Sequence, residues 1–287
     1  MKNKFLDNTN IEIFPIGLGA MPLSLEGRPD ETQALEVINT FINGGGNFID
    51  SANVYCVDDN DVGHNEKLIA KALTQHVSKN NILVATKGGL RRPKGEWKVD
   101  GSPAWLRASC EKSLRDLNTD SIFLYQLHAP DPDVPFTDSV GELLKLKEEG
   151  KIHYIGLSNV TVEQIEYALS ITHIMSVQNR CNLFERTSFK NGVVKFCEDN
   201  NITFIAHSPV GGHYQHAQRA ENVLLKKLSE KYDASPYQIM IAWLLHKGQN
   251  IFPIPGASKV SSIEDSLKSK NIELSKEDML LLEANNK

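Results

Sequence analysis

Residues 47–55 read NFIDSANVY, which contains a short apolar run followed directly by a polar residue. The recurrence of this pattern along the chain decides the fold. Phe48 and Ile49 have the character of a buried strand, yet the carboxylate of Asp50 follows them directly, and Tyr55 comes five positions later. A buried charge without a partner costs several kcal/mol. A strand that ends on a carboxylate therefore implies a partner for that charge. Other strands that end on polar residues could provide such a partner.

Short apolar runs recur along the chain, and most of the intervals between them have helical periodicity, with apolar residues at i, i+3/4 and i+7. The helices are expected to begin at caps and to end at glycines. The runs are FPIGLGA (14–20), NFID (47–50), ILVATK (82–87), SIFLYQLH (121–128), HYIGLSN (153–159), MSVQN (175–179), ITFIAHSP (202–209) and NIFPIPG (250–256). The caps are Asp30, Ser102 with Pro103, Thr161 and Ser235 with Pro236, and the stops are Gly44, Gly150 and Gly248.

Eight strands that alternate with helices predict an α/β fold, a (β/α)8 TIM barrel that spans residues 1–287 as a single domain. A doubly wound open sheet is the alternative, and the absence of a GxGxxG motif between the first strand and helix weakens it. Ahead of the first barrel strand, KFLDNTNIEI predicts a β-hairpin with Asp7 and Asn8 in its turn.

The composition favours a soluble globular protein over several other classes of protein. Hydrophobic residues make up 40% and charged residues 23%, and the net charge of -5 argues against a nucleic-acid binder. No segment has the length of a signal peptide core or a membrane helix, so we expect a cytoplasmic protein without a membrane partner. The cysteines are scattered, which predicts reduced thiols and no metal site: Cys56, Cys110, Cys181 and Cys197.

Polar residues stand at the end of strand after strand, and the carboxyl ends of barrel strands converge on one mouth. The ends are Asp50, Lys87, His128, Ser158 with Asn159, and Gln178 with Asn179. Because Asp50 and Lys87 come from neighbouring strands, we expect them to form an ion pair. A nearby ammonium favours the phenolate, so Lys87 is expected to lower the pKa of Tyr55 and make it a proton donor. Since no side chain donates a hydride, such a site requires a nicotinamide cofactor.

Nine segments taken together resemble the aldo-keto reductase family. The resemblance implies a (β/α)8 barrel that holds an extended NADPH, with a catalytic tetrad of Asp50, Tyr55, Lys87 and His128. It also implies a small-molecule aldehyde or ketone as substrate. The segments are IGLGAM (16–21), FIDSANVY (48–55), GHNEKLI (63–69), ATK (85–87), YQLHAPD (125–131), GKIHYIGLSN (150–159), SVQN (176–179), HSPVGG (207–212) and PIPGAS (253–258).

The resemblance also implies roles for individual residues. Tyr55 protonates the carbonyl oxygen, Lys87 lowers its pKa, Asp50 holds Lys87, and His128 orients the carbonyl. The implied contacts of the nicotinamide carboxamide and ribose are Ser158, Asn159, Gln178, Gly19, Ala20, Met21 and Asp50.

Two positions depart from the family pattern. His207, ahead of Ser208, Pro209 and Val210, stands where many members have an aromatic residue that stacks on the nicotinamide. At the adenosine end, Asp265 and Ser266 replace the usual Glu-Asn pair, and Asp265 is expected to accept from the adenine amine. The remaining implied contacts at this end are Gly256, Ser258, Lys259 and Ser262, which favour NADPH over NADH.

Further hypotheses remain open at the level of sequence. Lys87 could be the Schiff-base lysine of a barrel aldolase, and a regulatory cofactor-binding module of the potassium-channel β-subunit type would keep the same barrel. The short tail predicts a fairly open site for small or medium aldehydes. Gly211 and Gly212 suit a pyrophosphate, and we expect His213 and His216 to be a solvated surface pair. Nothing in the pattern specifies the oligomeric state.

Overall fold

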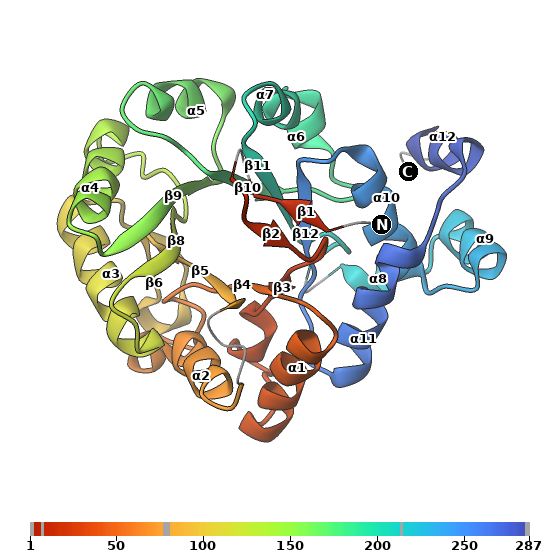
Figure 1. Cartoon of the computed structure of the whole chain (residues 1–287), viewed down its shortest axis with the longest axis horizontal. Coiled ribbons are helices and arrows are strands. Elements are labelled where there is room, and N and C mark those ends of the chain that lie inside the picture. The colour runs from red at the N-terminus through yellow and green to blue at the C-terminus, as the bar shows by residue number, and fades with distance from the viewer. Residues whose placement is uncertain (1–2, 7–8, 77–80, 213–214, 285–287) are drawn as a thin grey trace.

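The computed structural model describes residues 3–6, 9–76, 81–212 and 215–284, and it contains the predicted barrel (Figure 1). Eight strands are joined side by side in the order β12-β11-β10-β9-β8-β5-β4-β3, and all neighbouring pairs are parallel. Their bounds are β3 Leu18–Gly19, β4 Phe48–Asp50, β5 Leu83–Gly88, β8 Ile122–Leu127, β9 Ile152–Ser158, β10 Ser176–Arg180, β11 Thr203–His207 and β12 Ile251–Ile254. Each lies within or overlaps one of the eight predicted runs.

The two edge strands, β3 and β12, approach each other closely enough to bring the barrel near to closure. Gly17 and Gly19 donate their N–H groups to the carbonyls of Pro253 and Pro255, both at 3.0 Å, and Gly19 forms a parallel bridge with Gly256. A doubly wound sheet leaves its edge strands apart, so this contact excludes that alternative.

Helices surround the strands and cover the outer face of the barrel (Figure 1). The predicted caps are all present, since Asp30, Ser102, Thr161 and Ser235 each accept a hydrogen bond from a backbone N–H in the first turn. The helices are α1 Glu31–Asn43, α2 His64–Leu73, α3 Pro103–Leu117, α4 Phe136–Glu148, α5 Val162–Leu169, α6 Thr187–Lys190, α7 Val193–Asp199, α8 His216–Ala220, α9 Val223–Tyr232, α10 Pro236–Lys247, α11 Val260–Lys268 and α12 Lys276–Ala284.

The predicted N-terminal hairpin is formed by β1 (Lys4–Phe5) and β2 (Glu12–Ile13), which pair antiparallel. Its expected turn residues, Asp7 and Asn8, lie outside the described residues. The hairpin buries Leu6 and Ile13 against the core of the barrel, and Lys4 donates to the carbonyl of Ile251 at 2.5 Å. Residues at the amino end of β12 make this contact, so the hairpin covers the barrel opposite the predicted mouth.

A second hairpin, which the sequence did not predict, follows β5. It consists of β6 (Leu90–Arg91) and β7 (Lys98–Val99), paired antiparallel. Trp97 lies just before β7 and is 49% exposed, although the guanidinium of Arg92 stacks on its ring at 4.0 Å. This hairpin places an aromatic side chain at the rim of the mouth.

Candidate active site

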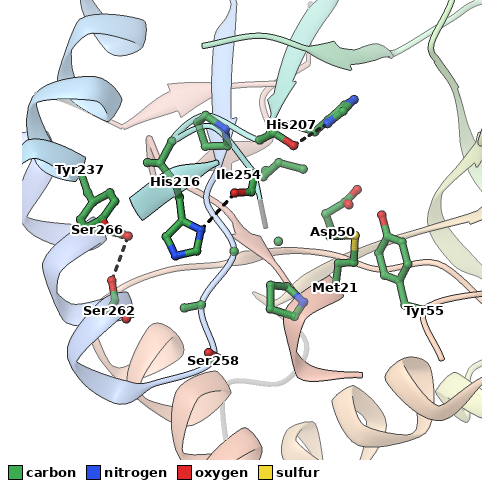
Figure 2. Close-up of a pocket in the computed structure, with 18 of the residues that line it drawn as sticks. Met21, Asp50, Tyr55, His207, His216, Tyr237, Ile254, Ser258, Ser262 and Ser266 are labelled. Carbon is green, nitrogen blue, oxygen red and sulfur yellow. Dashed lines mark hydrogen bonds between the residues drawn. The ribbon is translucent and has the colours of Figure 1, made fainter. Parts of the chain in front are cut away.

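The carboxyl ends of the strands open into one cavity of about 800 Å³ (Figure 2). Most residues singled out from the sequence line it, together with several that were not. The predicted residues in the lining are Gly19, Met21, Asp50, Tyr55, His128, Ser158, Asn159, Gln178, His207, Ser208, Pro209, Val210, Gly256, Ser258, Ser262, Asp265 and Ser266. The lining residues that sequence reasoning missed include Leu90, Trp97, His216 and Tyr237.

Three predicted site residues do not line the cavity. Lys87 is wholly buried behind Asp50 and Tyr55. Ala20 is also buried and contributes its backbone, which donates to Asp50 O at 2.9 Å and accepts from Asn65 at 2.8 Å. Lys259 is exposed at the start of α11, one residue beyond Ser258 in the lining. Ala20 therefore shapes the site through its neighbours.

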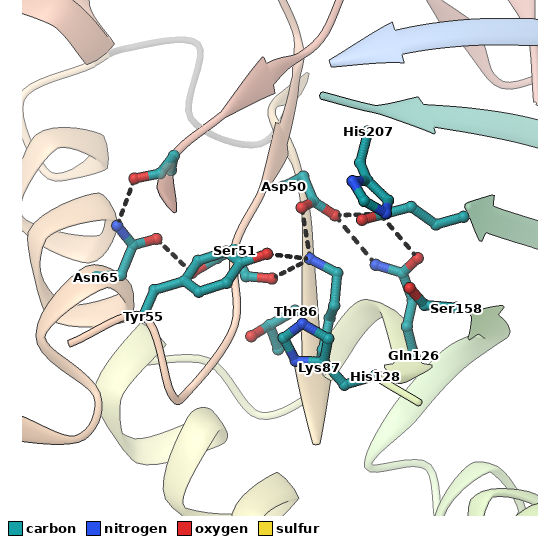
Figure 3. Close-up of polar contacts among 12 residues, drawn as sticks. Asp50, Ser51, Tyr55, Asn65, Thr86, Lys87, Gln126, His128, Ser158 and His207 are labelled. Atoms are coloured by element: carbon teal, nitrogen blue, oxygen red, sulfur yellow. Dashed lines mark hydrogen bonds and ion pairs between the residues drawn. The ribbon is translucent and has the colours of Figure 1, made fainter. Parts of the chain in front are cut away.

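The Lys87 ammonium is the centre of the buried polar cluster (Figure 3). Its Nζ donates to Asp50 Oδ1 at 2.5 Å, to the carbonyl of Ser51 at 2.8 Å and to Tyr55 Oη at 3.1 Å. Three acceptors match the three N–H bonds of an ammonium. The predicted ion pair between Asp50 and Lys87 is thus present, and both side chains are almost inaccessible to solvent.

Burial and charge act in opposite directions on Lys87. Burial lowers the pKa of an ammonium, but the carboxylate of Asp50, followed by Tyr55, outweighs that effect and raises the pKa of Lys87 above 10.5. Lys87 therefore stays charged at neutral pH.

The pKa of Tyr55 departs from the expectation made from the sequence. Burial raises it above 10.0, the Lys87 ammonium lowers it, and the Asp50 carboxylate adds to the rise. Lys87 does act in the expected direction, but burial and Asp50 outweigh it. Tyr55 is therefore a neutral phenol at neutral pH, which is the form that can donate a proton.

His128 faces Tyr55 across the mouth, with ring centroids 5.8 Å apart in an edge-to-face arrangement. Burial, the Lys87 ammonium and His207 all lower its pKa well below 6.5. Its buried Nδ1 has no hydrogen-bond partner within the described part of the chain. A neutral imidazole with an unpaired nitrogen beside a phenol is equipped to hydrogen-bond a polar ligand atom.

The second oxygen of Asp50 accepts from two amides. Gln126 and Gln178 donate to Oδ2 at 3.1 and 2.8 Å, and Gln178 also donates to Gln126 at 3.2 Å. Sequence reasoning missed Gln126, although its place inside the apolar run of YQLH was a usable signal, because a buried amide needs a partner. These bonds hold the carboxylate in the orientation that pairs with Lys87.

The neighbouring strand ends form a polar wall beside this cluster. Asn159, with a φ of +59°, donates to the carbonyl of His128 at 2.9 Å and to Ser158 Oγ at 3.1 Å. His207 Nδ1 contacts Ser208 Oγ at 3.2 Å. Burial, then the charges of Lys87 and Arg180, lower the pKa of His207 to about 3. Its ring is therefore uncharged at neutral pH.

At the far end of the cavity the expected adenosine contacts are already engaged with one another. Asp265 accepts from Ser235 Oγ and from Gln238 Nε2, both at 2.6 Å. Ser266 Oγ donates to the carbonyl of Ser262 at 3.0 Å. His216 lines the cavity, so the expectation of a solvated surface pair is wrong for this residue, because α8 carries it inward; His213 lies outside the described residues.

Comparison with known proteins decides the family. A model described as the aldo/keto reductase family matches residues 15–287. The chain belongs to this family.

Curated relatives agree with that assignment. An uncharacterized oxidoreductase of Schizosaccharomyces pombe is 35% identical, over 91% of this chain and 83% of its own length. A probable aldo-keto reductase of Glycine max is 31% identical, over 96% of this chain and 86% of its own length. The chain is therefore similar over nearly its whole length to proteins described as oxidoreductases.

Solved structures share the whole barrel of this aldo/keto reductase. The thermostable aldo-keto reductase Tm1743, solved with the inhibitor epalrestat, superposes with a TM-score of 0.83 at 30% identity, over 99% of both chains. The glycerol dehydrogenase AKR11B4 from Gluconobacter oxydans superposes with a TM-score of 0.84 at 26% identity, over 98% of this chain and 94% of its own. Family and structure together support a carbonyl oxidoreductase that acts with a nicotinamide cofactor.

The cavity of this aldo/keto reductase fits an extended dinucleotide. Tyr55 and Tyr237 lie at opposite sides of it (Figure 2). Gly256 lies in the lining and is exposed, and a Cβ there would lie 2.7 Å from Pro22, so a bare backbone borders the cavity. Next to Ser258 of the lining, α11 begins at Val260, and its N-cap residue Lys259 makes no side-chain capping hydrogen bond. Free N–H groups at a helix start suit a phosphate.

Two further features are absent from the described residues, a cluster of metal ligands and a membrane-spanning helix. No group of three or more metal-ligating side chains occurs among them. No helix in the described ranges is long and apolar enough to cross a membrane.

Proposed function

We propose that this protein is an NADPH-dependent carbonyl reductase in which Tyr55 is the proton donor. The observation that carries the proposal is the contact of Lys87 Nζ with both Tyr55 Oη, at 3.1 Å, and Asp50 Oδ1, at the mouth of a cavity large enough for a dinucleotide. A neutral phenol, a fixed ammonium and a neutral imidazole meet there. This set suits the transfer of a proton to a carbonyl oxygen as negative charge develops on it.

The roles of the side chains follow from their protonation states. When bound, the reduced nicotinamide supplies the hydride that no side chain can donate. Tyr55 donates its proton to the substrate oxygen, and the Lys87 ammonium stabilises the phenolate that remains. Asp50 holds Lys87 in place and balances its charge, and His128 donates a hydrogen bond that orients the carbonyl. In the reverse direction the phenolate of Tyr55 accepts the proton of an alcohol.

The contacts proposed for the nicotinamide half lie at the ends of four strands, β3, β9, β10 and β11. Ser158, Asn159 and Gln178 offer polar groups for the carboxamide, and the uncharged ring of His207 offers a face for stacking. The backbone of Gly19 and the side chain of Met21 border the same space.

The preference for NADPH rests on the charge near α11. Lys259 and the helix N-terminus place positive charge next to Ser258 and Ser262, where a 2′-phosphate would be stabilised. Ser208, Pro209, Val210 and the glycines that follow are proposed to border the pyrophosphate.

An aldolase function for Lys87 lacks support from the structure. A Schiff-base lysine needs a free amine, which burial without a counter-charge provides. Lys87 is instead held charged by Asp50 and has no solvent-accessible surface. No observation favours a regulatory module without turnover.

Small and medium aldehydes are the proposed substrates. Among the described residues, none beyond Ser266 lines the cavity, because α12 packs on the outside of the barrel beside α9 and α10 (Figure 1). Tyr232 and Lys231 of α9 both bond Asp278 of α12 and hold it there. The substrate end is bordered by Leu90 and Trp97 from the second hairpin.

The test is the loss of NADPH absorbance with 4-nitrobenzaldehyde, for the wild type and for Tyr55→Phe. Tyr55→Phe removes the acidic proton and keeps the ring, so kcat should fall by roughly 10²- to 10⁴-fold, while the Kd for NADPH, measured by fluorescence, stays within about threefold. An NADH arm with the wild type should give a lower kcat/KM. Turnover by Tyr55→Phe close to wild type would refute the proton-donor role, and faster turnover with NADH would refute the choice of NADPH.

A further inference from the structure

Two aromatic rings stand together at the end of the cavity that lies away from Tyr55 (Figure 2). Tyr237 belongs to the first turn of α10, and His216 begins α8. Their ring centroids are 6.2 Å apart, and the planes are inclined by 43°. Both side chains line the cavity. Neither residue belongs to the set of cofactor contacts that the sequence suggested, so this end of the cavity contains an aromatic pair that was not predicted.

Both oxygens of the Asp265 carboxylate accept a hydrogen bond from the first turn of α10. Oδ2 accepts from Ser235 Oγ, and Oδ1 accepts from Gln238 Nε2, each at 2.6 Å. Ser235 and Gln238 stand on either side of Tyr237 in the first turn of α10, and Ser235 also caps that helix by accepting from the N–H of Gln238. Asp265 therefore fixes α11 to the turn that carries the Tyr237 ring.

The serine that follows Asp265 in the chain is engaged as well. Ser266 Oγ donates to the carbonyl of Ser262 one helical turn earlier. This end of the cavity therefore presents the aromatic rings of Tyr237 and His216. The Asp265 carboxylate beside them already accepts one hydrogen bond on each oxygen. A planar base can gain stacking energy from such faces whatever groups its edge carries, since every base has a π-face.

We propose that Tyr237 and His216 hold the base of the cofactor's adenosine half by stacking, and that Asp265 positions Tyr237 and does not read the edge of the base. This inference rests on the proposed function, because it concerns the binding site of the same cofactor. It replaces the expectation that Asp265 accepts a hydrogen bond from the adenine amine. Its consequence is that the site tolerates a change at the 6-position of the purine.

The experiment compares two cofactors by isothermal titration calorimetry, NADP+ and its analogue in which hypoxanthine replaces adenine. The analogue has an oxo group in place of the amine. We expect the wild type to bind the two with Kd values within about threefold of each other. If Asp265 read the amine, the analogue would bind roughly tenfold or more weakly, as expected when a hydrogen bond to a charged group is lost.

Three variants separate stacking from positioning. Tyr237→Ala should weaken both cofactors by roughly tenfold or more, the loss expected for one base–aromatic contact. Tyr237→Phe keeps the ring and should bind both like the wild type. Asp265→Ala should weaken both by the same factor, because it releases the Tyr237 turn. Tyr167→Ala removes an exposed tyrosine of α5, outside the cavity, and serves as the matched control.

Each other result has a definite meaning. A wild type that prefers adenine tenfold, with a preference that Asp265→Ala abolishes, overturns the inference and leaves the reductase function intact. Unchanged binding by Tyr237→Ala overturns it too. A wild type that binds neither cofactor and reduces no aldehyde contradicts the proposed function itself, and the inference fails with it.

Discussion

His207 shows how the structure sets the state of a single side chain. In the sequence, His207 stands where the family resemblance implies an aromatic ring that stacks on the nicotinamide. In the fold it is half-buried in the lining of the cavity, and desolvation, followed by the charges of Lys87 and Arg180, lowers its pKa to about 3. A ring that is uncharged can stack on a nicotinamide without the repulsion that a cationic ring would add when that nicotinamide is oxidised.

This burial makes the free energy of unfolding depend on pH. The imidazole has an ordinary pKa of 6.5 in the unfolded chain and about 3 in the folded one. Between these values the unfolded state binds more protons, so His207 reduces stability as the pH falls, by about 1.4 kcal/mol per pH unit. His207→Phe removes this dependence, and urea unfolding at pH 7.5 and pH 5 should show a smaller loss of stability than in the wild type.

The control for that comparison is His153→Phe, which changes an exposed histidine of β9 in the same way. His128 is present in every protein of this set, so the difference between variants isolates His207. An identical loss of stability in wild type and His207→Phe would contradict the lowered pKa of His207.

At the scale of elements, the contact between α2 and β5 supports the strand that carries Lys87. Thr86 donates to Glu66 Oε1 at 2.6 Å, and Glu66 is fully buried. Burial raises the pKa of Glu66 to about 7, against the smaller opposing effects of Ser113 and Thr86. Residues alternate along a strand, so Thr86 points outward to α2 while Lys87 points into the barrel.

Glu66→Gln should therefore act on stability in a direction that depends on pH. Between pH 4.5 and pH 7 the folded state holds the proton that the unfolded state has lost, so Glu66 reduces stability as the pH rises. The full effect is roughly 3 kcal/mol. Relative to the wild type, Glu66→Gln should gain stability between pH 5 and pH 8 in urea unfolding. The exposed Glu36→Gln on α1 is the control, and a pH-independent difference would refute the argument.

At the scale of the whole molecule, closure of the barrel depends on a close approach of β3 and β12. A Cβ on Gly19 would lie 2.8 Å from the carbonyl oxygen of Ile254, a contact that real Cβ atoms do not make. The backbone of either strand would have to move. The residue after Gly19, Ala20, donates its N–H to the carbonyl of Asp50, so such a movement would reach the site. Closure and site geometry are therefore linked.

Gly19→Ala should destabilise the protein by about 1–3 kcal/mol, the usual cost of overpacking, in urea unfolding at pH 7.5. Gly141→Ala is the matched control, since Gly141 lies within α4 and a Cβ there meets nothing within 4 Å. Alanine is favoured over glycine in a helix, so the control should gain about 0.5–1 kcal/mol. Equal effects of the two substitutions would show that strand approach does not limit closure.

Much of the fold was predictable because its signals are local. Apolar runs, caps such as Ser102 and Ser235, and the glycine stops depend on near neighbours in the chain, and the structure agrees with each of them. The pairing of Asp50 with Lys87 followed from the adjacency of their strands. The second hairpin was missed because β6 and β7 have only two residues each, too few to show a period.

The sequence by itself determined the barrel and the identity of the residues that form its mouth, because strand order places successive strand ends side by side. Only the tertiary structure decided which of these groups are charged and which already have hydrogen-bond partners within the protein. Burial keeps Tyr55 and His207 neutral, and Ser235 and Gln238 engage Asp265 across two helices. Desolvation and contacts between distant segments exist only in the folded chain, and no local pattern encodes their balance.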